Sequence, residues 1–125
     1  MSRIFITGSS AGLGLLAGRH LIGQGHEVVM HARTPEKARA LRTELPGAAE
    51  VLVADLESMA QTRALADSAN ALGRFDAVIH NAGVGDRGTD RLGPDGLPVV
   101  FAVNVLAPYL LTALMLTSGL VLAAA

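Results

Sequence analysis

A chain of 125 residues, half of them apolar, is long enough for one domain with a modest hydrophobic core. Its formal net charge of −1, with ten Lys and Arg spread along the sequence, excludes an electrostatic footprint for nucleic acid or an anionic membrane surface. Cysteine is absent and the four histidines lack ligand-like spacing, so we expect neither disulfides nor a metal site.

Strand and helix patterns alternate in the N-terminal part of the chain. Short β-rich or apolar runs predict four strands, at residues 3–7, 27–31, 50–54 and 75–80. Helical patterns fall between them, at residues 12–25, 34–45 and 58–72, where Thr34 suits an N-cap and Pro35 the first helical position. Apolar strands joined through helices require crossover connections, so we predict a Rossmann-type, doubly wound α/β fold with a parallel sheet.

The C-terminal part has a different composition. Residues 83–98 are rich in Gly, Asp, Arg and Pro and predict a loop, whereas residues 99–116 predict one long apolar helix. We expect an incomplete dinucleotide-binding domain at 1–116, truncated after about four strands and this helix, and an atypical apolar tail at 117–125. The fourth strand would then have an unpaired edge.

A membrane anchor is the alternative interpretation of this region. Residues 105–125 carry no charge and are about long enough to cross a bilayer. Pro108 and the lack of basic residues after the stretch disfavour an anchor. Because the apolar run at the N-terminus is too short for a signal peptide, we expect a cytoplasmic protein.

A glycine-rich turn, Thr7-Gly8-Ser9-Ser10-Ala11-Gly12-Leu13-Gly14, connects the first strand to the first helix. Gly8 would permit the tight turn, Gly12 the close approach of a pyrophosphate, and Gly14 the packing of the helix on the sheet. The helix N-terminus would present free N–H groups to phosphates. An ordinary strand-to-helix turn is the alternative for this pattern alone. No Gly-Lys-Ser/Thr follows, so a P-loop is disfavoured.

The end of the second predicted strand carries information about the cofactor. An acidic residue there would bind the ribose 2′-hydroxyl of NAD, whereas an arginine accommodates the 2′-phosphate of NADP. The sequence reads His31-Ala32-Arg33, and the planar guanidinium of Arg33 suits a phosphate. NADP is therefore preferred to NAD, the alternative being that Arg33 is an ordinary solvated residue.

Five motifs, in order, resemble those of the short-chain dehydrogenase/reductase family over roughly the first 116 residues. They are Thr7-Gly8-x-x-x-Gly12-x-Gly14, Ala32-Arg33, Asp55-Leu56, Asn81-Ala82-Gly83, and Phe101-Ala102-Val103-Asn104 leading into Pro108-Tyr109-Leu110-Leu111-Thr112. The resemblance implies a nicotinamide dinucleotide and a carbonyl or alcohol substrate. It also implies packing against a second copy through the helix at 99–116.

The resemblance assigns roles to individual residues. Phosphate and ribose contacts would come from Gly8, Ser10, Gly12, Gly14 and Arg33, the adenine contact from Asp55, and the ribose side from Asn81 and Gly83. Asn104 would belong to the catalytic set. Asp55 could instead cap the following helix, and Asn81 could close a turn. Asn104, which we expect to be a buried amide, could serve only core hydrogen bonding.

The proton-transfer residues of that family have no counterpart here. A tyrosine, a lysine four residues later and a serine would be needed, because the ammonium lowers the pKa of the tyrosine. The only tyrosine, Tyr109, is followed four positions later by Ala113, and we expect it to pack in the long helix. Ser118 lacks a predicted strand before it. The sequence thus predicts an NADP(H)-binding portion that is catalytically incomplete, the alternative being a non-catalytic nucleotide-binding or partner-binding module.

Overall fold

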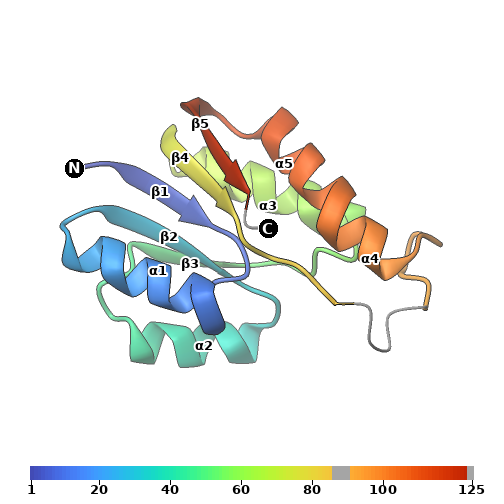
Figure 1. Cartoon of the computed structure of the whole chain (residues 1–125), viewed down its shortest axis with the longest axis horizontal. Helices are drawn as coiled ribbons and strands as arrows, with labels where there is room; N and C mark the ends of the chain where they lie inside the picture. The colour runs from blue at the N-terminus through green and yellow to red at the C-terminus, as the bar shows by residue number, and fades with distance from the viewer. Residues whose placement is uncertain (86–90, 124–125) are drawn as a thin grey trace.

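The computed structural model describes residues 1–85 and 91–123. Figure 1 shows a twisted sheet with helices on both faces. The strands are β1 (Arg3–Ile6), β2 (Glu27–Ala32), β3 (Glu50–Val53), β4 (Phe75–His80) and β5 (Thr117–Ala123). The helices are α1 (Gly12–Gly23), α2 (Pro35–Glu44), α3 (Met59–Ala71), α4 (Val99–Phe101), the π-helix η1 (Ala102–Leu106) and α5 (Ala107–Leu114).

The sheet is parallel, with strand order β3-β2-β1-β4-β5. This confirms the predicted doubly wound α/β architecture. Successive side chains of a strand point to opposite faces, so the strands supply two cores. One core packs against α1 and α2 and contains Ile4, Ile6, Val28 and Met30. The other packs against α3, α4 and α5 and contains Phe5, Val29, Phe75 and Val78.

Local capping explains where two of the helices begin. Thr34 is the N-cap of α2, its side chain accepts a hydrogen bond from the Lys37 N–H, and Pro35 takes the first helical position. Ser58 caps α3 through the Gln61 N–H. The alternative that Asp55 caps α3 is therefore wrong.

The predicted long helix at 99–116 contains a π-helical turn and is shorter than expected. The Ala107 N–H bonds to the carbonyl of Ala102, five residues earlier, and Pro108 has no N–H to continue the α pattern. The helix ends at Leu114, after which Met115 is extended. This turn falls around Asn104, whose contacts are described below.

The segment expected as an atypical tail is the fifth strand. Residues Thr117–Ala123 pair in parallel with β4, with Ala77 opposite Leu120 and His80 opposite Ala123. The expected unpaired edge of the fourth strand is thus wrong, and the sheet has one strand more than predicted. A short apolar run carries no periodicity that distinguishes a buried strand from a helix end, which is why the sequence pattern missed β5.

Residues 105–123 do not form one continuous helix, because α5 ends at Leu114 and β5 follows; residues 124 and 125 lie outside the described part of the chain. Within residues 1–85 and 91–123, no helix is both long and apolar enough to span a bilayer.

Candidate functional site

A pocket of about 300 Å³ lies at the carboxyl ends of the strands. In the sheet order β1 lies between β2 and β4, and this reversal is where open α/β sheets form a ligand crevice. The pocket is lined by Gly8, Ser10, His31, Arg33, Ala54, Asp55, Leu56, Glu57, Asn81, Ala82, Gly83, Val84 and Val103. Six of the nine predicted site residues are among these. Gly12, Gly14 and Asn104 are outside the lining.

The main chain of the glycine-rich turn packs directly against the residues that follow β4. Gly8 has φ +63°, and a Cβ on it would lie 2.7 Å from the Ala82 Cα. A Cβ on Gly14 would lie 2.5 Å from the Asn81 Nδ2. Gly12, at φ +59°, faces open space. Two of these glycines are therefore required by the packing of the turn, whereas at Gly12 the requirement is conformational and the space beside it is free.

Hydrogen bonds fix the turn to the end of β4. The Thr7 hydroxyl oxygen accepts from the main-chain N–H groups of Asn81 and Ala82, both at 3.1 Å. The Asn81 amide donates to the carbonyl of Gly8 at 3.0 Å. Asn81 thus joins two segments far apart in the sequence, rather than closing a turn of its own. Thr7 was not predicted as a site residue, although it immediately precedes the glycines.

His31 holds the other side of the turn, and its role was also missed. Its Nδ1 accepts from the Gly8 N–H at 2.9 Å, so the ring proton is on Nε2, which donates to the Ala54 carbonyl at 2.8 Å. Ser9 is fully buried beside it and accepts from the His31 N–H. Burial lowers the pKa of His31, while the bond to Ala54 and the charge of Asp55 act in the opposite direction. The neutral imidazole is thus part of the pocket wall.

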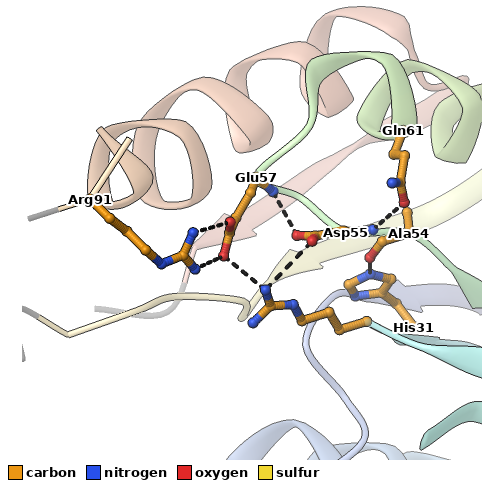
Figure 2. A network of polar contacts seen from close by, with 7 residues as sticks. His31, Ala54, Asp55, Glu57, Gln61 and Arg91 are labelled. Carbon is orange, nitrogen blue, oxygen red and sulfur yellow. Dashed lines mark hydrogen bonds and ion pairs between the residues drawn. The ribbon is translucent and has the colours of Figure 1, made fainter. Parts of the chain in front are cut away.

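A charged cluster lies near the ends of β2 and β3 (Figure 2), and three of its members, Arg33, Asp55 and Glu57, line the pocket. Arg33 Nη2 contacts Glu57 Oε2 at 2.9 Å and Asp55 Oδ2 at 3.5 Å. Arg91 binds Glu57 with both terminal nitrogens, Nη1 to Oε1 at 2.8 Å and Nη2 to Oε2 at 2.6 Å. Asp55 Oδ1 accepts from the Glu57 N–H, and the Asp55 N–H donates to Gln61. Two predicted site residues, Arg33 and Asp55, thus meet in this cluster. Glu57 and Arg91, which also belong to it, were not predicted as site residues.

Glu57 is the most enclosed charge of this cluster. Its side chain is 6% accessible, against 50% for Arg33 and 52% for Arg91. The hydrogen bonds from Arg91 lower the pKa of the Glu57 carboxyl, burial opposes this, and the positive charges of Arg33 and Arg91 add to the lowering. The same contact raises the pKa of Arg91. Glu57 is thus an ionised carboxylate covered by two guanidinium groups.

Comparison with known proteins identifies the family of this chain. Residues 2–121 match the family model described as short chain dehydrogenase. The chain belongs to the short-chain dehydrogenase family. An uncharacterized oxidoreductase from Emericella nidulans is 54% identical over 117 residues, which are 92% of this chain and 46% of that protein. The short-chain dehydrogenase chyC of Penicillium rubens is 53% identical over 92% of this chain and 44% of its own length. The chain thus spans about half the length of these curated relatives.

Solved structures of short-chain dehydrogenases share the fold. A metagenomic short-chain oxidoreductase in complex with NADP superimposes with a TM-score of 0.74 at 35% identity, over 91% of this chain and 54% of that chain. A short-chain dehydrogenase from Sphingobium yanoikuyae in complex with NADPH gives a TM-score of 0.75 at 27% identity, over 90% and 46%.

Asn104, the residue that the short-chain dehydrogenase resemblance assigns to catalysis, braces a loop in this structure. Its Oδ1 accepts from the Val84 N–H at 2.8 Å and its Nδ2 donates to the Val84 carbonyl at 2.9 Å. Asn104 is exposed, so the expectation of a buried amide is wrong: the π turn directs it toward the loop after β4 rather than into the core. Gly83 lies beside it, since a Cβ there would be 3.5 Å from the Asn104 Oδ1. Tyr109 is 66% exposed and does not pack inward as expected.

Proposed function

We propose that this chain is the NADP(H)-binding portion of a short-chain dehydrogenase that transfers hydride between the nicotinamide and a carbonyl or alcohol substrate. The observation that carries the proposal is the open helix N-terminus beside the pocket. Ala11 is the N-cap of α1, and within the described residues no side chain caps this helix and no acid lies in its first turn. Such an end offers N–H groups and a positive dipole to a pyrophosphate.

The residues of the pocket fit the remaining parts of the nucleotide. Ser10 lines the pocket, and Gly12 at the start of α1 has open space beside it, where the missing Cβ would admit a phosphate. Asp55 would accept from the adenine amino group, and Asn81 and Gly83 would line the ribose. The exposed guanidinium of Arg33 would bind the 2′-phosphate. Solved relatives whose structures hold NADP or NADPH support this cofactor choice.

The chain's own residues would bind and orient the dinucleotide, which supplies the hydride when bound. Proton transfer requires further groups, since the tyrosine of this sequence has no lysine four positions later. We therefore expect nucleotide binding by the purified chain and no detectable carbonyl reduction.

The test is a titration of the purified chain with NADPH and with NADH, followed by nicotinamide fluorescence. NADPH should bind more tightly, and Arg33→Ala should reduce the preference by roughly 10- to 100-fold, the contribution of charge-assisted hydrogen bonds to a phosphate. The matched control Arg39→Ala removes an exposed arginine of α2 outside the pocket lining. Absence of nucleotide binding by a folded chain would refute the proposal.

We also propose that the outer face of the α4–α5 helix packs against a second copy. Phe101, Val105 and Tyr109 lie four residues apart on it and are 44%, 55% and 66% exposed. An apolar stripe of this kind is typical of a protein interface. Sedimentation of the chain should show self-association that Tyr109→Glu abolishes; a monomer at all concentrations would refute this second proposal.

A further inference from the structure

The charged cluster contains an arginine, Arg91, that belongs to none of the five sequence motifs. Arg91 lies after the loop that follows β4, 34 positions from Glu57, and holds both oxygens of that carboxylate. It is absent from the lining of the pocket, whereas Arg33 and Glu57 are part of it. Within the described residues, the hydrogen bonds of the Arg91 side chain join it to the pocket lining at Glu57.

The position of Arg91 is fixed by its own segment. Leu92 and Pro98 form an antiparallel bridge, and the Val99 N–H donates to the Arg91 carbonyl at 3.3 Å. Asp95 accepts from the Met59 N–H at 2.8 Å, which ties the segment to the first turn of α3, two residues after Glu57. These contacts thus fix the turn that carries Arg91, and the turn holds the Arg91 side chain beside Glu57.

The charge balance around Arg33 depends on this contact. Arg33 touches two carboxylates, those of Asp55 and Glu57. One guanidinium against two carboxylates leaves an excess negative charge, which would repel a 2′-phosphate. Arg91 supplies the second positive charge and binds Glu57 in the two-pronged geometry that guanidinium and carboxylate favour. Glu57 then makes one contact with Arg33, through Nη2. This contact orients the Arg33 guanidinium and leaves its other nitrogens free of Glu57.

Arg33 keeps donors for a ligand in this arrangement. Both of its ion pairs with described residues use Nη2, so in the described part of the chain Nη1 and Nε are not engaged by protein. Half of the side chain is accessible. These are the donors with which a planar guanidinium binds a phosphate.

We propose that Arg91 is a specificity-determining residue that sets the preference for NADP(H) over NAD(H) without touching the nucleotide, by neutralising Glu57 and so leaving the charge of Arg33 to the 2′-phosphate. This inference rests on the proposed binding of NADP(H). It concerns only the ratio of the two affinities, because the adenine, ribose and pyrophosphate are shared by both nucleotides.

The experiment is a four-protein cycle of the full chain: wild type, Arg91→Met, Glu57→Gln and the double variant. Each is titrated with NADPH and NADH. Arg91→Met should lower the NADPH-to-NADH affinity ratio roughly tenfold, the effect of one uncompensated charge at short range near the surface, with NADH affinity nearly unchanged. Glu57→Gln should keep or raise the ratio. The double variant should return to within about threefold of wild type, because the charge that Arg91 compensates is gone.

Arg19→Met is the matched control, since Arg19 also forms an exposed ion pair, with Glu44 at 2.9 Å, and loses the same charge away from the pocket. It should leave the ratio unchanged, and thermal melts verify that every variant is folded. An unchanged ratio in Arg91→Met, or a double variant as low as Arg91→Met, would overturn the inference, as would a fall of the ratio in Glu57→Gln. A wild-type ratio near one would instead refute the NADP(H) preference of the proposed function.

Discussion

The two sides of the pocket are held in place by different kinds of contact. On the turn side, Gly8 and Asn81 meet through main-chain atoms and one amide, at distances that leave no room for an added carbon. On the arginine side, the long, half-exposed side chains of Arg33 and Arg91 meet at the enclosed carboxylate of Glu57. Steric contacts between main-chain atoms fail abruptly when changed, whereas partly solvated charges change gradually with salt and substitution. The turn side should therefore govern whether any nucleotide binds, and the arginine side which one.

The largest expected effect is on the turn side. Gly8→Ala would place a Cβ 2.7 Å from the Ala82 Cα at a positive φ. We expect a loss of roughly 3 kcal/mol in the free energy of unfolding, from overpacking and left-handed strain together, and no measurable binding of either nucleotide. Thermal melts and fluorescence titrations measure the two effects.

Gly23→Ala is the control for that substitution. A Cβ on Gly23 would meet nothing within 4 Å, and the residue is helical. Its stability should rise by about 0.5–1 kcal/mol. If Gly8→Ala bound NADPH normally, the steric description of the turn side would be incorrect.

A second prediction concerns pH, because His31 links the two sides. Burial lowers its pKa from 6.5, so as the pH falls below 6.5 the unfolded chain takes up a proton that the folded chain does not. The free energy of unfolding should therefore fall with falling pH, by up to about 1.4 kcal/mol per pH unit for this group. Burial lowers the pKa of His80 too, which adds a slope of the same sign.

Denaturant unfolding at pH 5–7 separates these contributions. His31→Gln should reduce the slope by roughly one group's share, since Gln does not titrate. His20→Gln, at an exposed position of α1, serves as the control. Equal slopes in the wild type and in His31→Gln would contradict the role of the neutral imidazole.

A smaller effect is expected from Asn81→Ala. This change removes the hydrogen bond to the Gly8 carbonyl, at a cost of about 1 kcal/mol, and loosens the turn. Both NADPH and NADH should bind about fivefold more weakly, with their ratio unchanged. Asn70→Ala, which removes bonds to Leu114 and Leu116 on the far side of the fold, should lower stability and leave both affinities intact. A change of the ratio in Asn81→Ala would mean that the two sides are not separable.

The smallest effect isolates the arginine side. Because the shared phosphates cancel in the ratio of the two affinities, its salt dependence reports the half-exposed Arg33. Raising the ionic strength from about 0.05 to 0.5 M should lower the NADPH-to-NADH ratio by roughly two- to threefold. A salt-independent ratio would place the 2′-phosphate away from Arg33.

The same division explains what the sequence could and could not predict. The turn side follows from local rules: glycine spacing after a strand, and Thr34 with Pro35 at the start of the next helix, depend on neighbours in the chain. The parallel sheet follows from alternating strand and helix patterns. The cluster at Glu57 depends on Arg91, 34 positions away, and no local pattern pairs them. The sequence placed His31 at the end of a strand and Thr7 before a glycine, but it did not indicate that both side chains hold the turn.

Most of the wrong expectations fall in the C-terminal part, where local patterns conflict. The apolar run at β5 has no period that separates strand from tail, and its pairing with β4 depends on where α5 delivers it. The exposure of Asn104 depends on the π turn, and helical spacing assumes a regular α-helix. Hydrophobic patterning is least informative where nearly every residue is apolar.

The π turn also determines which residues of α5 face the sheet. A π turn is equivalent to one residue inserted into an α-helix, so regular α winding of Ala102–Leu106 at the same length would rotate everything after it by about 100°. That rotation would carry Leu111, now fully buried, out of the core and break the register between helix and sheet. The buried position of Leu111 therefore requires either that this wide turn is kept or that its extra residue is lost together with it.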